Sequence, residues 1–226
     1  MGVTFDLAEH PVRELNAYLH GCSDPAAVTV TNTRGLHNVA VGADAPLDIN
    51  IDGHVGYYCA GMNQQARITI DGNAGPGVAE NMMSGRVRIT GNASQYAGAT
   101  AHGGLLVIEG DASSRCGISM KGVDIVVRGN VGHMSAFMAQ KGRLVICGNA
   151  GDALGDSLYE ARLYVRGEVA SLGADCVEKP MRDEHLEELS TLLQQAGITD
   201  VRANEFRRYG SARTLYHFQA DNLDAY

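Results

Sequence analysis

The sequence contains no tryptophan and few other aromatic residues, with four phenylalanines and nine tyrosines among 226 residues. Charged residues make up only 19% of the chain, and no apolar run reaches the roughly 18 residues of a membrane-spanning helix. The N-terminal stretch also has no apolar core of signal-peptide length. Because hydrophobic residues still amount to 45%, the chain can bury a core, and we expect a folded cytoplasmic protein without a membrane partner.

The net charge of −8 gives the chain no general attraction to a phosphate backbone, which argues against nucleic acid as a partner. Its five cysteines are odd in number and form no C-x-x-C motif, so neither a disulfide framework nor a local metal cradle is predicted. The chain begins with Met1, whereas a glutaminase of the N-terminal-nucleophile type needs a cysteine at its mature terminus. We therefore assign no catalytic, cofactor-binding or metal-binding residue to this chain.

Glycine is abundant, with 28 residues, and much of it recurs at a fixed spacing of 19. Branched aliphatic residues stand two and four positions before each of these glycines, and alanine or valine stands two positions after. The position seven residues after is always alanine or glycine, as at Gly98, Gly117 and Ala136, and bulk there is predicted to be poorly tolerated. The repeat glycines, interpreted as structural turn residues, are Gly53, Gly72, Gly91, Gly110, Gly129, Gly148 and Gly167.

Apolar residues at every second position before a glycine are typical of a strand with one buried face. Such a unit buries that face only by stacking on copies of itself. The sequence therefore predicts an all-β fold, a single right-handed parallel β-helix of about seven 19-residue coils spanning residues 47–178. Residues 1–46 are predicted to form an N-terminal cap with a short helix after Pro11. Residues 179–226 are predicted to form a capping helix, from Asp183 to Ala196, followed by an extended arm.

Two surfaces of this predicted fold are candidates for contact with a partner protein. On the outer face of the main strands, apolar residues form a contiguous patch, which either the chain's own helix or another subunit must cover. Beside it Arg67 stacks on Arg86 and Arg143 on Arg162, as a solvated face or as a surface for an acidic partner. The C-terminal arm mixes arginine with aromatic residues, as interface anchors do. The candidate interface residues are Leu105, Val107, Val126, Val145, Tyr164, Phe206, Arg207, Arg208, Tyr209, Arg213, Tyr216 and Phe218.

The coils carry the strings GHVGYYCAGMN, GNAGPGVAENMMSGR and GHMSAFMA after their glycines, and with these the chain resembles the GXGXG β-helix family. That family includes the C-terminal domain of the glutamate synthase large subunit and a subunit of formylmethanofuran dehydrogenase. The start, FDLAEHPVRELNAYLH, and the end, EFRRYGSARTLYHF, are similar to the stand-alone β-helix subunit of N-methylglutamate synthase, the methylamine-glutamate N-methyltransferase.

The resemblance implies a non-catalytic scaffold subunit of a glutamate synthase-like complex. Its implied partners are a glutaminase-like subunit of the class II amidotransferase type and a glutamate synthase-like subunit that holds FMN and an iron–sulfur cluster. The assembly would convert methylamine and L-glutamate to N-methyl-L-glutamate and ammonia. Two alternatives stay open, a subunit of a formylmethanofuran dehydrogenase-like enzyme and a β-helix acyltransferase. The second is the weaker, because a left-handed acyltransferase helix repeats every sixth residue and 19 is not a multiple of six.

Overall fold

The structure, a computed structural model, describes residues 2–24 and 26–213 of the chain. In this part no helix is both long and apolar enough to cross a membrane. The helices are α1 (Val12–Gly21) and α2 (Asp183–Ala196), with a short 3₁₀ helix, η1 (Ala203–Glu205). The strands are β1 (Val3–Asp6), β2 (Ala27–Thr31), β3 (Asp48–Asp52), β4 (Arg67–Asp71), β5 (Arg86–Ile89), β6 (Leu105–Ile108), β7 (Lys121–Val127), β8 (Lys141–Ile146), β9 (Arg162–Val165), β10 (Cys176–Lys179) and β11 (Arg207–Ser211).

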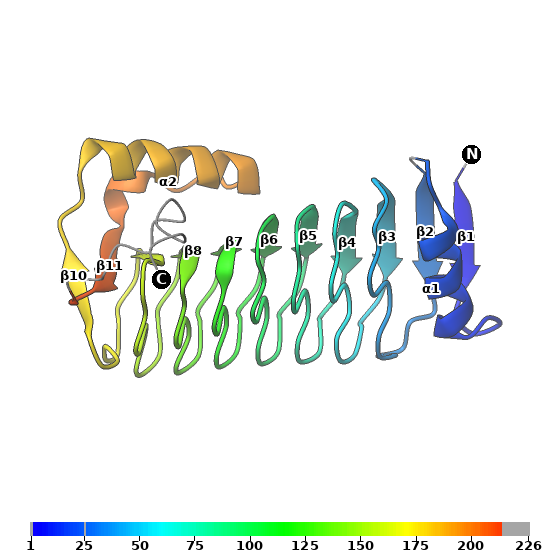
Figure 1. Ribbon diagram of the computed structural model, residues 1–226, viewed down its shortest axis with the longest axis horizontal. Coiled ribbons are helices and arrows are strands. Elements are labelled where there is room, and N and C mark those ends of the chain that lie inside the picture. The colour runs from blue at the N-terminus through cyan, green and yellow to red at the C-terminus, as the bar shows by residue number, and fades with distance from the viewer. Residues whose placement is uncertain (1, 25, 214–226) are drawn as a thin grey trace, which may run out of the picture.

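All eleven strands belong to one sheet, which runs along the length of the molecule (Figure 1). Strands β1 to β9 follow one another in sequence order and pair in parallel, and β11 and β10 close the far end. From β3 to β9 the paired residues are 19 apart, apart from a local irregularity at the start of β7. The predicted parallel β-solenoid of about seven coils is confirmed.

The solenoid interior is filled by ladders of identical register. The residues two and four before each repeat glycine, such as Val87 and Ile89 on β5, are fully buried and lie beside their equivalents Leu106 and Ile108 on β6. A second ladder of single parallel bridges joins the residues two after the glycines. A further column of the return segments, formed by Met82, Ala101, Met120, Ala139 and Leu158, is also buried.

The return segments of the coils turn by a regular alternation of backbone conformation. Five, seven and nine residues after each repeat glycine from Gly53 to Gly148, φ is positive, as at Arg115, Gly117 and Ser119. The middle position of each triplet is the alanine or glycine register, and its alanines Ala60, Ala79 and Ala136 are fully buried. The small register is thus defined by two properties, a left-handed backbone and a position against the core.

An additional coil precedes the seven that the period of 19 revealed. Strand β2 pairs in parallel with β3, and residues 38, 40 and 42 repeat the positive-φ triplet of the later return segments. The offset is 21 residues on the strand, from Val28 to Ile49, and 20 in the return, from Asn38 to Tyr58. Because this coil is one or two residues longer than the others, a search for a fixed period of 19 does not detect it. Helix α1 packs beside it through Leu15 and Leu19, which are fully buried.

The C-terminal end differs from the extended arm expected after the capping helix. Strand β11 returns between β9 and β10 and pairs antiparallel with both. Its Tyr209 is 3% exposed and joins the solenoid core, so this ring covers the open end of the last coil. Antiparallel closure leaves no parallel edge strand beyond β9, the usual requirement at the end of a solenoid.

The repeat glycines lie at the bend after each strand. A left-handed backbone does not explain why glycine stands at all of these positions. Of the seven, only Gly53 has positive φ. The others face a ladder of side chains, in which the N–H of Asp111 donates to Oδ1 of Asn92 at 2.8 Å and the N–H of Asn130 donates to Oδ1 of Asp111 at 2.6 Å. A Cβ at Gly110 would overlap the Asn92 side-chain oxygen and lie 2.8 Å from the Gly91 carbonyl oxygen. Glycine is therefore required by the close approach of the preceding coil.

We expect Gly110→Ala to cost about 1–3 kcal/mol of unfolding free energy, because the added methyl displaces the Asn92 amide from its ladder. Asn92→Ala removes one hydrogen bond and should cost about 1 kcal/mol. In the double variant the overlap with Asn92 is gone, so its cost should fall below the sum of the two by more than about 0.5 kcal/mol. Denaturant unfolding measures all three.

Gly210→Ala is the matched control for this cycle, since a Cβ at that position meets nothing closer than 3.5 Å. It should change the free energy of unfolding by less than about 0.5 kcal/mol. Strictly additive costs for Gly110→Ala and Asn92→Ala would show that the amide ladder does not select the glycine.

Candidate partner interface

The apolar patch predicted on the outer sheet face lies beneath the chain's own helix α2. Val107, Val126, Val145 and Tyr164 are each 0% exposed and form a second core with Leu189, Leu192, Leu193 and Ala196 of the helix. From the sequence, either the chain's own helix or another subunit could cover this patch. In this structure α2 covers it. Leu105 lies at the margin of this core and is half-buried.

The described residues of the predicted C-terminal anchor make their contacts within the chain. Phe206 is buried in the second core, and Tyr209 in the solenoid core. Among the arginines, Arg207 donates to the Gly167 carbonyl, Arg208 donates to the Pro180 carbonyl, and Arg213 pairs with the Asp175 carboxylate. Tyr216 and Phe218 lie outside the described residues. The surface that the folded chain offers to a partner is therefore not the patch itself.

A charged column on the outer face, five residues before each repeat glycine, stays at the surface. Along the seven coils it consists of an aspartate, two arginines, a leucine, and then an aspartate and two arginines again. The second half repeats the first at a distance of 76 residues, which is four coils. Strand pairing places consecutive members side by side. The members are Asp48, Arg67, Arg86, Leu105, Asp124, Arg143 and Arg162.

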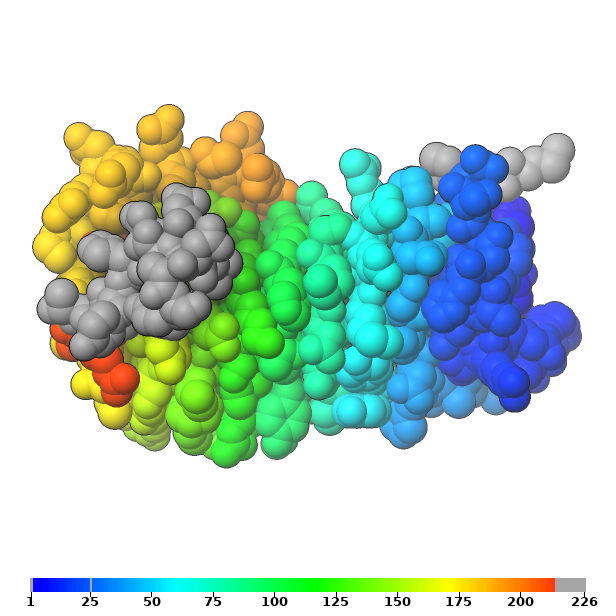
Figure 2. All heavy atoms as spheres, viewed as in Figure 1, coloured from blue at the N-terminus to red at the C-terminus, as the bar shows by residue number. Residues whose placement is uncertain are grey.

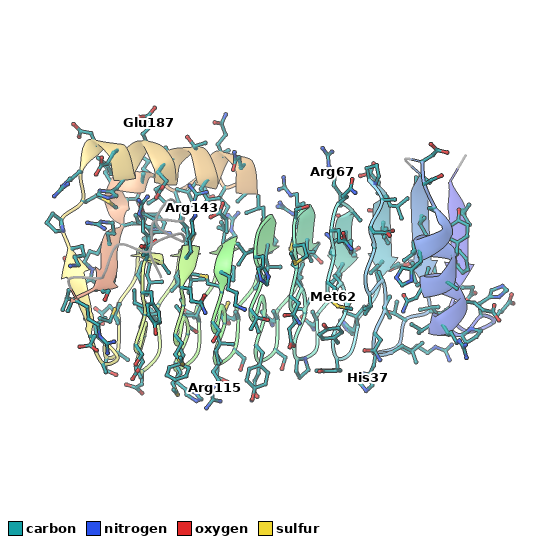
Figure 3. All side chains as sticks on the ribbon, viewed as in Figure 1. His37, Met62, Arg67, Arg115, Arg143 and Glu187 are labelled. Atoms are coloured by element: carbon teal, nitrogen blue, oxygen red, sulfur yellow. The ribbon has the colours of Figure 1, made fainter. Side chains whose placement is uncertain are left out.

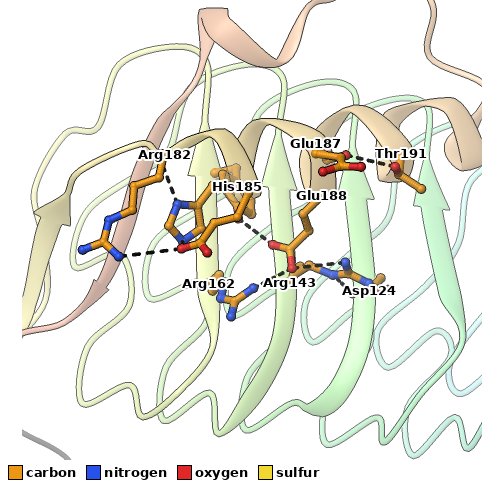
Figure 4. A network of polar contacts seen from close by, with 10 residues as sticks. Asp124, Arg143, Arg162, Arg182, His185, Glu187, Glu188 and Thr191 are labelled. Carbon is orange, nitrogen blue, oxygen red and sulfur yellow. Dashed lines mark hydrogen bonds and ion pairs between the residues drawn. The ribbon is translucent and has the colours of Figure 1, made fainter.

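In the C-terminal half of this column, helix α2 supplies the opposing charge (Figure 4). Nε of Arg143 donates to Asp124 at 2.6 Å, and Nη1 of Arg162 donates to Glu188 of α2 at 2.5 Å. Glu188 also lies 3.5 Å from Nη1 of Arg143 and accepts a 2.6 Å hydrogen bond from the hydroxyl of Tyr164. The hydrogen bond to Asp124, with the charges of Asp124 and Glu188, raises the pKa of Arg143 despite its partial burial. The carboxylate of Glu188 thus ties α2 to two neighbouring strands.

In the N-terminal half the same column has no such partner. Among the described residues, neither Arg67 nor Arg86 forms an ion pair, and α2 ends before it reaches them. Burial and then the charges of Arg88 and Arg67 lower the pKa of Arg86, the reverse of the shift at Arg143. Figure 3 shows Arg143 below α2 and Arg67 beyond the end of the helix. Arg67 has Asp48 as one cross-strand neighbour, but Arg86 lies between Arg67 and Leu105, so two like charges are side by side, which is electrostatically unfavourable.

A groove of about 670 Å³ lies over this half of the sheet. In the space-filling view the upper outline dips just beyond the end of α2, between the helix and the cyan N-terminal coils (Figure 2). Arg88 marks the boundary, since its Nη1 donates to the carbonyl of Ala196 at the C-terminus of α2, at 2.9 Å, and its Nη2 pairs with Glu109. The groove is lined by Asp48, Asn50, Gln65, Arg67, Ile68, Thr69, Gly85, Arg86 and Arg88.

The histidine, cysteine and acidic side chains that could bind a metal or act in catalysis do not form a site. Within residues 2–24 and 26–213, no three His, Cys, Asp or Glu side chains are grouped as metal ligands. Cys59 and Cys116 are fully buried, and burial raises the pKa of the Cys116 thiol to about 12. A thiol with so high a pKa is a poor nucleophile at neutral pH.

The four-coil repeat of the charged column was within reach of sequence analysis. When the residues five positions before each repeat glycine are compared, the four-coil repeat is evident. The two arginine pairs alone do not reveal it. That Glu188 completes one half and nothing described completes the other depends on where α2 docks, which the amphipathic pattern of the helix does not specify.

No family model matches the chain. Over 224 residues the chain is 64% identical to Protein GlxC of Rhizobium meliloti (strain 1021), and the match covers 98% of either protein. The chain belongs to the GlxC family. Because the match is nearly full length, it includes counterparts of α1, of the glycine-anchored coils and of α2. GlxC itself is therefore about the size of this β-solenoid.

Proposed function

We propose that this GlxC-family chain is a non-catalytic scaffold subunit of a glutamate synthase-like complex. The full-length similarity to GlxC carries the proposal, since GlxC has the size of a stand-alone β-helix and no room for a synthase or glutaminase domain. The coil pattern gives it a glutamate synthase relationship through the resemblance to the GXGXG β-helices. Its place in the complex is between the subunits that perform the chemistry.

The rigid, elongated solenoid supports a scaffold role. Coils stacked about 4.8 Å apart give seven coils a length of about 30 Å, enough to hold two globular subunits at a fixed separation. Both ends are covered within the chain, at one end by β1 and α1 and at the other by β11 and β10. Because the terminal strands β1 and β10 have only four residues each, we expect partners to bind along the flanks and not to extend the sheet.

In the finer form of the proposal, the complex is an N-methylglutamate synthase. A glutaminase-like subunit of the class II amidotransferase type and a synthase-like subunit with FMN and an iron–sulfur cluster perform the reaction. Methylamine and L-glutamate are converted to N-methyl-L-glutamate and ammonia. The buried thiols of Cys59 and Cys116 favour this division of labour, since they are unsuited to act as glutaminase nucleophiles.

We expect the isolated chain to bind no FMN and to release no ammonia from glutamine. The complex purified through a tag on this chain should contain FMN and should release ammonia from glutamine. Mass spectrometry of the tagged complex identifies the subunits, and its visible spectrum reports flavin and iron–sulfur absorption. A stoichiometric flavin on the isolated chain would contradict the scaffold role. A tagged chain that purifies alone from cells that contain the glutamate synthase-like subunits would remove the proposal altogether.

A further inference from the structure

We propose that Arg67 and Arg86, bounded by Arg88 at the end of α2, form a docking surface for an acidic helix of a partner subunit, which lies over β3 to β5 in line with α2. This inference rests on the proposed function, because it assumes that the chain has a protein partner. It adds the site of contact and the chemistry of the partner segment. Figure 1 shows that α2 ends before it reaches β3 and β4.

The strongest support is the internal repeat of the charged column. Asp48, Arg67 and Arg86 stand 76 residues before Asp124, Arg143 and Arg162, on strands with the same parallel register. The second triplet shows which group these residues bind when the sheet face is covered. A glutamate from an overlying helix lies within 3.5 Å of both arginines. The first triplet has the same residue types in the same arrangement, but within residues 2–24 and 26–213 no carboxylate from an overlying helix pairs with its arginines.

The electrostatics of the first triplet favour an anion. Arg67 and Arg86 are paired neighbours on adjacent strands, with Arg88 two residues further along β5. Burial and the charges of Arg88 and Arg67 already lower the pKa of Arg86. A carboxylate placed between the guanidinium groups of Arg67 and Arg86 would relieve their repulsion and form ion pairs with both, as the Glu188 carboxylate does with Arg143 and Arg162.

The geometry of α2 indicates the form of the partner segment. Helix α2 runs along the solenoid axis, so about three residues, at about 1.5 Å each, span one coil spacing of about 4.8 Å. Acidic residues three or four apart on one helix face would therefore meet arginines of successive coils. At the centre of the face, Asn50, Thr69 and Arg88 stand where the second half has Val126, Val145 and Tyr164. The contact is consequently polar and should weaken with salt.

A helix fits this groove better than a small anion. The groove extends over three strands and opens to the surface, whereas a site for a small ligand encloses most of the ligand. The groove also begins where α2 ends, at the hydrogen bond from Arg88 to the carbonyl of Ala196. A second helix in the groove would therefore extend the helical layer that α2 forms over the sheet.

Carbodiimide cross-linking tests the proposal, because it joins a lysine to a carboxylate only where the two are in contact. The chain has three lysines, Lys121, Lys141 and Lys179, so an Arg86→Lys variant adds one new reactive amine to a low background. In the assembled complex we expect Arg86→Lys to couple to an acidic segment of a partner subunit, identified by mass spectrometry of the linked peptides. Arg162→Lys is the matched positive control and should couple to Glu188 within the chain.

Several outcomes would overturn the docking surface. These are coupling of Arg86→Lys only to carboxylates of this chain, including residues 214–226, coupling only to a second copy, or no coupling while Arg162→Lys reacts with Glu188. In each case an intact complex leaves the scaffold proposal standing. If the wild-type chain forms no complex at all, both proposals fail.

Charge reversal gives an independent measurement in the same complex. Arg67→Glu with Arg86→Glu should weaken the affinity for the partner at least tenfold at low salt, and by less as salt is raised. Arg115→Glu, on the opposite edge of the solenoid (Figure 3), should leave the affinity within twofold. Equal effects of the double variant and Arg115→Glu would contradict the proposal, and so would a loss of affinity that salt does not alter.

Discussion

A chain that ends at Glu205 should unfold at a temperature about 10 °C or more below that of a chain that ends at Arg213. The shorter chain lacks Phe206 and all of β11, and with them two aromatic side chains that are 5% and 3% exposed. Truncation of a buried aromatic residue costs about 3–5 kcal/mol, and in a protein of this size each kcal/mol lowers the melting temperature by about 2–4 °C.

The loss extends beyond these side chains because β11 is the partner of two strands. Without it β10 has no neighbour in the sheet, and β9 becomes an open edge. The chain that ends at Arg213 keeps every strand and helix of the described structure and is the matched control. Thermal unfolding followed by circular dichroism compares the two, and equal melting temperatures would show that β11 is dispensable for folding.

This expectation revises the interpretation of the C-terminal arm as an interface anchor. Strand β11 takes residues 207–211 out of the arm and into the fold. The hypothesis that the remainder anchors a partner, with Tyr216 and Phe218, stays a prediction. Partner capture by the chain that ends at Arg213 tests it without disturbing β11.

The features that the sequence predicted well are those that local chemistry repeats or terminates. The 19-residue period fixed the registers of β3 to β9, since each coil buries the same positions against the next. The helix from Asp183 to Ala196 was predicted with its correct bounds, because its leucines share one face and Gly197 adopts the left-handed conformation that ends it.

The features that escaped prediction depend on long-range pairing. Strand β2 breaks the period by two residues, and β11 has the sequence RRYGS, without the alternation of a half-buried strand. Neither its antiparallel insertion between β9 and β10 nor the docking of α2 on Val107, Val126 and Val145 is encoded locally. For the candidate interface this was decisive, because the sequence left the outer apolar patch to either the chain's own helix or a partner, and α2 covers it.

Gly117→Leu should lower the free energy of unfolding by about 2–5 kcal/mol, one of the largest effects of any single substitution in the coils. Two costs add at this position. The backbone has φ of 68°, where an L-residue is less stable than glycine. A Cβ there would lie 3.2 Å from Cδ1 of Ile125 and 3.3 Å from Sδ of Met120, so the rest of a leucine side chain has no space.

Two further variants separate these costs. Gly117→Ala tests the backbone together with the close Cβ contacts, and it should cost about 1 kcal/mol, because Ala136 holds a methyl group at the same register with φ of 58°. Met138→Leu places leucine at another left-handed position, φ 52°, whose side chain is 41% exposed, and should change stability by less than about 0.5 kcal/mol. Denaturant unfolding of the three variants should therefore rank Gly117→Leu far above the others. If Gly117→Leu and Met138→Leu destabilise equally, the register seven residues after the glycine does not face a filled core, and the ladder assignment of the coils is wrong.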